Sequence, residues 1–241
     1  MNNLKKIAIL QPNYIPWKGV FDLIRTVDIF VFYDDVQYTT KDWRNRNKIK
    51  TKDGMKWLTV PVIKKGMRHQ PISETKIDNS TNWQSKHYKT LISSYSKSPH
   101  LKDYEYLLEE IYLKKKWNML TDLDVKSTIL IANALGIKKT EWYKSSDFHE
   151  TGSKDGEKVI KICQRLGCNH FINGPASRDY MNEDLFSKND VKLSYIDYQY
   201  PEYPQLHGPF CHQVSILDLL FNCGPNALDF IINKSSRNAL E

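Results

Sequence analysis

The sequence predicts an α/β protein built on a parallel sheet. Short, continuously apolar runs at 5–10 (KKIAIL) and 28–33 (DIFVFY) are typical of strands that are buried on both faces, as in parallel sheets. Helical periodicity then dominates residues 82–136, and strand and helix patterns alternate again toward the C-terminus. We therefore expect a single α/β domain over residues 1–241, with a helical insertion at about 82–136.

Three strand segments are expected in the first part of the chain. The run at 5–10 leads into a proline- and aromatic-rich turn, and Gly19–Thr26 then forms a short helix with one apolar stripe. The second strand, 28–33, ends at a pair of aspartates. Met55–Val62 (MKWLTVPV) is the third strand candidate, because Asp53-Gly54 just before it is a turn signal.

Three amphipathic helices are expected in the insertion, at Trp83–Tyr95, Lys102–Trp117 and Asp122–Leu135. Gly136 stands where a glycine usually ends a helix. The remaining expected elements are a helix at Ser153–Leu166 closed by Gly167, strands at His170–Asn173 and Val191–Tyr198, a helix at Ser215–Asn222 that continues over Pro225–Ile232 after a break, and a frayed end at 235–241.

The charge of the chain favours anionic ligands. Thirty-five Lys and Arg against 28 Asp and Glu give a formal net charge of +7. The lysines are scattered, as on a solvated surface, and the sequence has no arginine-rich tract, RNA-binding motif or zinc finger. We therefore expect a small anionic substrate rather than a nucleic acid.

The chain is expected to be cytoplasmic. No apolar run approaches the roughly 18–20 residues that span a bilayer, and the apolar stretch before Gln11 is too short for a signal peptide. The four cysteines contain no CxxC pair and are expected to be reduced. A metal site drawn from His207, Cys211, His212 and Cys223 matches no common zinc module, so no metal is expected. The oligomeric state is open, with a homodimer as one option.

The loop after the first strand is the first candidate binding segment. Pro12 and Pro16 restrict its backbone, and the following helix offers free N–H groups that suit a phosphate or carboxylate. In the alternative, purely structural interpretation, Tyr14 and Trp17 plug the end of the sheet. The candidate substrate-binding residues here are Gln11, Asn13, Tyr14, Trp17, Lys18 and Gly19.

Asp34 and Asp35 end the second strand, where ligands collect in open α/β sheets. They could bind a metal, hold sugar hydroxyls or act as a general base, and they could also form ion pairs with Arg44 or Arg46 of the next loop. Trp43 and Trp57 could stack on a base or sugar ring, although Trp57, in the third strand candidate, is expected in the core. Further substrate-binding candidates in the loop are Gln37, Tyr38, Trp43, Arg44, Asn45, Arg46 and Lys48.

Two later segments repeat this arrangement of polar residues after a strand. The segment after His170–Asn173 could form the other lip of a crevice, with Asn173, Gly174, Ser177, Arg178 and Tyr180 as binding candidates. A cluster before the last long helix contains Tyr200, Tyr203, Gln205, His207 and His212. A histidine there is a candidate acid/base group, and we assign His207, together with Asp34 and Asp35, as catalytic.

The motifs QPNYIPWKG, DDVQY, WRNRNKIK, WLTVPV, GPASRDY and SILDLLFNCGP together resemble the WbqC-like family, over Ile7 to Pro225. Members of that family are typically encoded among genes for O-antigen and other surface-polysaccharide synthesis. The resemblance implies work on nucleotide-linked sugars in the cytoplasm. The motif positions carried over are Gln11, Pro12, Tyr14, Trp17, Gly19, Asp34, Asp35, Gln37, Asn45, Arg46, Gly174 and Tyr180.

A more distant resemblance is to the Rossmann-like, nucleotidylyltransferase-like fold, which includes pantothenate synthetase. Those enzymes share the opening strand, turn, helix and strand. They use a His-x-Gly-His turn and a downstream lysine loop, and this chain has neither. The resemblance therefore implies the fold, while adenylyl transfer is left in doubt.

The expected function is transfer of an acyl or aminoacyl group to the amine of a nucleotide-linked amino sugar. An adenylate route would need ATP with magnesium, whereas an acyl thioester donor would need neither. Two alternatives stay open: a nucleotidylyl- or glycosyltransferase-type enzyme, and a non-catalytic protein that binds a nucleotide sugar or scaffolds a synthesis complex.

Overall fold

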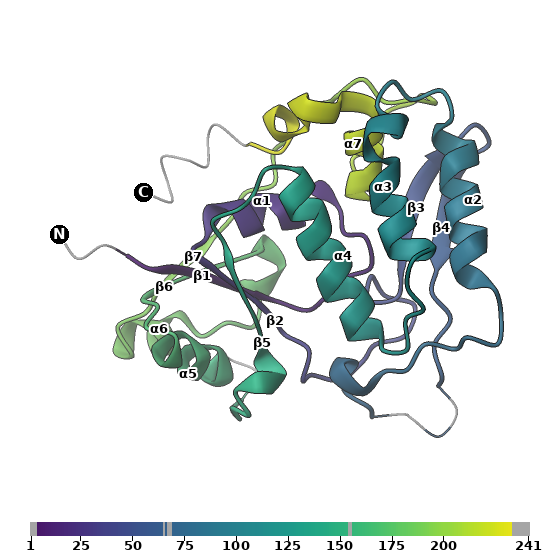
Figure 1. The fold of residues 1–241 in the computed structure, drawn as a ribbon. Helices are drawn as coiled ribbons and strands as arrows, with labels where there is room; N and C mark the ends of the chain where they lie inside the picture. The colour runs from purple at the N-terminus through teal and green to yellow at the C-terminus, as the bar shows by residue number, and fades with distance from the viewer. Residues whose placement is uncertain (1–3, 65, 67–68, 154–155, 233–241) are drawn as a thin grey trace.

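The computed structural model describes residues 4–64, 66, 69–153 and 156–232. A five-stranded parallel sheet lies at its centre, in the order β5-β2-β1-β6-β7 (Figure 1). The strands are β1 (Lys6–Leu10), β2 (Ile29–Phe32), β5 (Glu141–Lys144), β6 (His170–Asn173) and β7 (Lys192–Tyr195). This sheet, with helices beside it, confirms the predicted Rossmann-like α/β class.

Helices cover both faces of the sheet, and the side chains of each strand alternate between them. Ala8 and Phe30 pack in the larger core with α1 (Lys18–Thr26), α4 (Leu120–Ala134) and α7 (Ile216–Cys223). Ile7 and Ile29 pack in the second core with α5 (Glu157–Arg165) and α6 (Glu183–Lys188) on the opposite face (Figure 1). Burial on both faces explains why these strands are apolar without interruption.

The order of the strands reverses beside β1. From β1 the chain adds β2 and then β5 on one side, and it later adds β6 and β7 on the other. The loops that follow β1 and β6 therefore leave the carboxyl edge of the sheet in different directions. In open α/β sheets this topological switch point is the usual place for a ligand.

A separate hairpin corrects the expected role of Met55–Val62. β4 (Gly54–Thr59) does not join the main sheet and pairs antiparallel with β3 (Arg46–Thr51). Gly54, at φ 104°, makes the tight turn that returns the chain onto β3. Trp57 lies on the outer face and is 39% exposed, so the expectation that it belongs to the core is wrong. The short strand β5 supplies the fifth strand of the main sheet.

Three helices fill the region expected to be helical: α2 (Trp83–Tyr95), α3 (Leu101–Tyr112) and α4. α3 ends five residues before the expected Trp117, whose indole Nε1 instead donates 2.7 Å to the carbonyl oxygen of Ile111 in the last turn of the helix. This bond satisfies a free carbonyl of the helix end. α2 packs on α3 and on β3 (Figure 1).

The C-terminal elements are shorter than the sequence patterns predict. α5 begins at Glu157 rather than Ser153, after Gly156 at φ 118°. The expected continuation after Cys223 is a 3-10 helix, Gly224–Phe230, and 235–241 lie outside the described residues. Further short 3-10 segments are Ile72–Glu74, Ser145–Asp147 and Pro175–Ser177. Within the described ranges, no helix is long and apolar enough to cross a membrane.

Candidate functional site

A crevice of about 440 Å³ opens at the carboxyl edge of the sheet. The loop after β1, the start of the hairpin and the segment after β7 form its walls. This is the position that the reversal of strand order predicts for a ligand. Its lining residues are Asn13, Pro16, Trp17, Trp43, Asn47, Tyr198, Tyr200, His212 and Gln213.

One wall of the crevice is aromatic. The ring of Trp17 meets Tyr198 and Tyr200 edge-on, with centroids 5.0 and 6.0 Å apart. A Cβ atom on Gly19 would lie 2.3 Å from the Trp17 indole, so only glycine lets the ring lie against the start of α1. The Tyr200 hydroxyl donates 2.8 Å to Asp22. These contacts fix the orientation of the rings before any ligand binds.

The loop after β1 is anchored to the hairpin by amide groups. Asn47 Nδ2 donates to the carbonyl oxygens of Ile15 at 2.8 Å and Tyr14 at 3.2 Å, while Asn13 Oδ1 accepts from the Arg44 guanidinium. Ile15 has φ 37°, a conformation that strains a β-branched residue. Such strain persists only where the surroundings enforce it, and it is concentrated at functional sites.

Tyr14 lies behind this loop rather than in the crevice. It is fully buried, and its hydroxyl lies 2.8 Å from His87 Nδ1 and 2.5 Å from the Tyr112 hydroxyl. Burial lowers the pKa of His87 to about 4, so this imidazole is neutral at physiological pH. The structural interpretation, a plug at the end of the sheet, therefore describes Tyr14, whereas Trp17 faces the crevice.

His212 is the histidine among the described residues that line the crevice. Its ring packs edge-on against Phe210, with centroids 4.6 Å apart, and no described residue hydrogen-bonds its Nδ1. Burial and the nearby positive charge of Lys18 lower the pKa of His212. A neutral imidazole in a ligand crevice can accept a proton at physiological pH.

Lys18 lies behind the aromatic wall and is almost completely buried. Its ammonium donates 3.2 Å to the carbonyl oxygen of Pro201 and lies 5.1 Å from the ring centroids of both Tyr200 and Tyr203. Burial lowers its pKa to about 8. Cation–π contacts of this kind hold a positive charge near the crevice.

His207, which the sequence analysis assigned as catalytic, does not line the crevice. Its Nε2 lies 3.0 Å from the carbonyl oxygen of Ser94 on α2, and its side chain lines a different groove. His207 and His212 lie in the same loop, five residues apart. His207 lines that groove, and His212 lines the crevice. The sequence signal for His212 was its membership of the cluster that begins at Tyr200.

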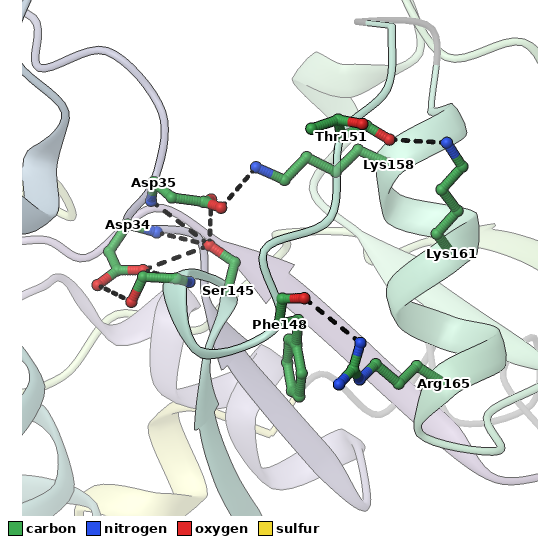
Figure 2. A network of polar contacts seen from close by, with 9 residues as sticks. Asp34, Asp35, Ser145, Phe148, Thr151, Lys158, Lys161 and Arg165 are labelled. Carbon is green, nitrogen blue, oxygen red and sulfur yellow. Dashed lines mark hydrogen bonds and ion pairs between the residues drawn. The ribbon is translucent and has the colours of Figure 1, made fainter.

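Asp34 and Asp35 take part in a polar network with the segment after β5 (Figure 2). Asp34 is fully buried, and its carboxylate accepts from the backbone N–H and the hydroxyl of Ser146, each at 3.0 Å. Asp35 accepts from the Ser145 hydroxyl at 2.5 Å and from the Lys158 ammonium at 2.7 Å. Neither aspartate lines the crevice.

A cationic and aromatic platform borders the crevice at Trp43. The Trp43 and Trp57 rings are 5.3 Å apart, and these residues are 40% and 39% exposed. The Arg46 guanidinium lies 4.2 Å and the Lys48 ammonium 5.0 Å from the Trp57 centroid. We call Trp43, Arg46, Lys48 and Trp57 the hairpin platform.

Four further candidates lie outside the crevice lining. Asn45 is buried and donates 2.8 Å to the carbonyl oxygen of Val60, and Tyr38 is also buried. Gln11 offers its carbonyl oxygen to Arg44 at 3.5 Å. Gln37 forms an isolated bridge with Pro71. These contacts show how the residues shape the loop.

The segment after β6 reaches the aromatic wall at one point. A Cβ atom on Gly174 would lie 3.1 Å from the Tyr198 hydroxyl, so glycine gives this crevice-lining tyrosine room. Asn173 and Ser177 bond the backbone of the segment. Arg178 lies 4.5 Å from the Tyr195 ring centroid, and Tyr180 is 55% exposed.

The described residues contain no group of three His, Cys, Asp or Glu side chains that could hold a metal ion. The cysteines at 163, 168, 211 and 223 are free thiols. The donor set of the crevice itself is one imidazole together with amides and aromatic hydroxyls.

Comparison with known proteins is consistent with the motif pattern. A model of the WbqC-like protein family matches residues 11–230. The chain is 43% identical over 229 residues to the Mycobacterium tuberculosis protein named "Uncharacterized protein Rv1507c", with 95% of this chain and 98% of that protein covered. No solved structure matches. The family match covers most of the chain, and the chain therefore belongs to the WbqC-like protein family.

Proposed function

We propose that this chain transfers an acyl or aminoacyl group to the amine of a nucleotide-linked amino sugar held in the crevice. The observation that carries the proposal is the crevice itself. It combines an aromatic wall, side-chain amides and a histidine of lowered pKa at the reversal of strand order. Aromatic surface with a few polar groups is the usual composition of a small-molecule site.

The hairpin platform suits the nucleotide part of such a substrate. Trp43 and Trp57 offer partly exposed aromatic surface for a base or sugar ring, and Arg46 and Lys48, which lie over the Trp57 ring, supply positive charge for a diphosphate. Trp43 belongs both to the platform and to the crevice. A nucleotide on the platform would therefore direct its sugar toward the crevice.

His212 is the proposed general base, in place of Asp34, Asp35 and His207. The neutral sugar amine forms a bond from its nitrogen lone pair to the acyl carbonyl carbon, and the bond from that carbon to the leaving group breaks. The proton that the nitrogen loses as the amide forms passes to the neutral imidazole, and the electron pair of the broken bond leaves with the thiolate or phosphate. Gln213 and the amide nitrogen of Asn13 are the proposed partners of the sugar hydroxyls, because the Asn47 amide is already bonded to the backbone.

An acyl thioester is the donor that the crevice chemistry favours. Magnesium prefers carboxylate oxygens, and no carboxylate is among the described residues that line the crevice. A thioester supplies its own leaving group and requires no metal ligand from the protein. A donor adenylate with magnesium is the alternative that an assay must include.

The test is an assay of purified protein with a nucleotide-linked amino sugar and acyl-CoA donors, or with ATP, magnesium and the free acid. The acylated nucleotide sugar is measured by mass spectrometry. We expect His212→Asn to lower turnover by about 100-fold or more. His207→Asn is the matched control, because that histidine lies outside the crevice, and it is expected to retain turnover.

Other outcomes would favour the alternative functions. Saturable binding of the nucleotide sugar without product under any donor would support a non-catalytic binding protein. Release of pyrophosphate from a nucleoside triphosphate would support a nucleotidylyltransferase. Equal loss of turnover in the His212 and His207 variants would contradict the base assignment.

A further inference from the structure

A second hollow lies beyond the crevice, between the hairpin and α2. Its volume is about 930 Å³, and its lining comes from the turn of the hairpin, one side of α2 and the loop at His207. None of the crevice residues lines it. We call it the lysine groove, and its charged residues are Lys52, Asp53, Lys56, Lys86, Lys89 and Lys97.

Lysines outnumber carboxylates in this groove. Among the described residues that line it, five lysines face one carboxylate, Asp53. Across the described residues, none of the five forms an ion pair. Lys86 and Lys89, three residues apart, lie on neighbouring positions of α2. Like charges gathered in a concave surface focus a positive potential that attracts anions.

Hydroxyl groups line the groove between the lysines. They belong to Thr51, Ser85, Thr90, Ser93, Ser94 and Ser96. Thr51, Thr90 and Ser96 donate to backbone carbonyl oxygens, which leaves the hydroxyls of Ser85, Ser93 and Ser94 as candidate donors. Ammonium and hydroxyl groups both donate hydrogen bonds to phosphate oxygens. No Trp, Tyr or Phe is among the described residues that line the groove, so these residues offer no ring on which a nucleic-acid base could stack.

We propose that the lysine groove binds a small anion that carries two or more linked phosphates. The concave shape and the volume match the range of small-molecule sites rather than a flat membrane-binding face. Several lysines around one hollow require several negative charges close together, which linked phosphates provide. The source is either an inorganic polyphosphate or the phosphate chain of a nucleotide. This proposal does not depend on the proposed acyl transfer.

The test is calorimetric titration of the purified protein with inorganic tripolyphosphate, ATP, and single phosphate as the reference anion. We expect tripolyphosphate to bind more tightly than single phosphate, with an affinity that falls as salt is added. The double variant Lys86→Gln/Lys89→Gln should weaken tripolyphosphate binding by about tenfold or more, because two charges are removed. Gln matches Lys in helix propensity, so α2 is retained. Equal binding of ATP and tripolyphosphate identifies the phosphates as the recognised group, and tighter binding of ATP identifies a nucleotide.

The matched control is Lys138→Gln/Lys139→Gln, which removes two exposed charges outside the groove. Lys48→Gln is a second control for anions that bind on the hairpin platform, where the proposed function places a diphosphate. Equal weakening in the groove and Lys138/Lys139 variants would show a general charge effect and overturn the proposal. Loss of binding in Lys48→Gln would overturn it by moving the anion to the hairpin platform. Absence of tripolyphosphate binding, or tighter binding of a DNA oligonucleotide or anionic vesicles through the same lysines, would also overturn it.

Discussion

Two polar clusters lie near the carboxyl edge of the sheet, and the protein uses their side chains differently. The cluster at Asp34 and Asp35 uses its carboxylates within the protein, on Ser145, Ser146 and Lys158. In the crevice, by contrast, His212 lines the cavity, and no described residue hydrogen-bonds its buried Nδ1. Polar residues after a strand are therefore a candidate site only where the fold places their side chains on a cavity that a ligand can enter.

The Asp34 cluster has a structural task that explains its composition. β5 is an edge strand of four residues, and the chain turns sharply after it at Ser145–Asp147. Asp34 accepts the N–H of Ser146 in this turn, and the Ser145 hydroxyl accepts from the backbone N–H of Asp34 at 3.0 Å. These reciprocal bonds join the ends of β2 and β5 (Figure 2).

The largest effect that tests this comparison is expected from Asp34→Ala. It removes the buried acceptor of two hydrogen bonds from Ser146, so the free energy of unfolding should fall by about 2–3 kcal/mol. For a chain of this size the melting temperature should fall by roughly 4–12 °C. Differential scanning calorimetry measures the change.

The control for this variant is ligand binding measured below its melting temperature. Nucleotide-sugar affinity should be retained, because Asp34 does not line the crevice. An unchanged melting temperature together with lost turnover would reverse the comparison and make Asp34 a functional residue.

A smaller effect is expected from the ion pair between Asp35 and Lys158. The two groups lie 2.7 Å apart and are partly exposed, with 20% and 10% of their side chains accessible. A double-mutant cycle with Asp35→Asn and Lys158→Gln should give a coupling energy of about 1 kcal/mol in thermal unfolding. Such coupling would identify the pair as a link between the end of β2 and α5.

The same double-mutant cycle can distinguish a structural role of the Asp35–Lys158 pair from a catalytic one. If Asp35→Asn abolishes acyl transfer while stability is unchanged, the pair belongs to the catalytic site. The corresponding control is the exposed helical pair of Lys114 and Glu110, also at 2.7 Å, for which a smaller coupling is expected because solvent screens it.

The sequence predicted the elements whose pattern follows directly from burial. β1 (KIAIL) and β2 (IFVF) are largely or fully apolar, as strands covered on both faces must be, whereas β6 (HFIN) is buried throughout with polar residues at its two ends. β3 (RNKIKT) and β5 (EWYK) carry no such pattern, because β3 pairs only within a hairpin and β5 lies at the sheet edge. Their positions depend on tertiary pairing, which a local pattern does not encode.

The loops that form the candidate site could be predicted from the sequence, but not every side chain that lines it. The proline-rich segment after β1 was selected from its position, and it supplies Asn13 and Trp17 to the crevice. The choice between His207 and His212 was not predictable, because both lie in an irregular segment whose path no periodicity fixes. Exposure of Trp57 likewise depends on the hairpin standing apart from the main sheet.

The smallest expected effect concerns the pH dependence of the crevice. A general base must be neutral, so acyl transfer should fall as pH drops through the pKa of His212. Burial and Lys18 lower that pKa from 6.5, so the acid limb of kcat/KM should have its midpoint below 6.5. Because the folded state disfavours the protonated imidazole of His212, the free energy of unfolding should decrease as pH falls through its pKa. Rate profiles from about pH 5 to about pH 8 measure the midpoint.

Lys18→Met sharpens this measurement, because it removes the positive charge and keeps much of the buried aliphatic chain. Without the positive charge of Lys18, protonation of His212 is less unfavourable, so the midpoint of the acid limb should move to higher pH. Calorimetry of the variant separates this shift from unfolding, since a fold defect lowers the rate at every pH. If the midpoint stays fixed in a folded Lys18→Met protein, a group other than His212 controls the acid limb. That group would then replace His212 as the proposed general base.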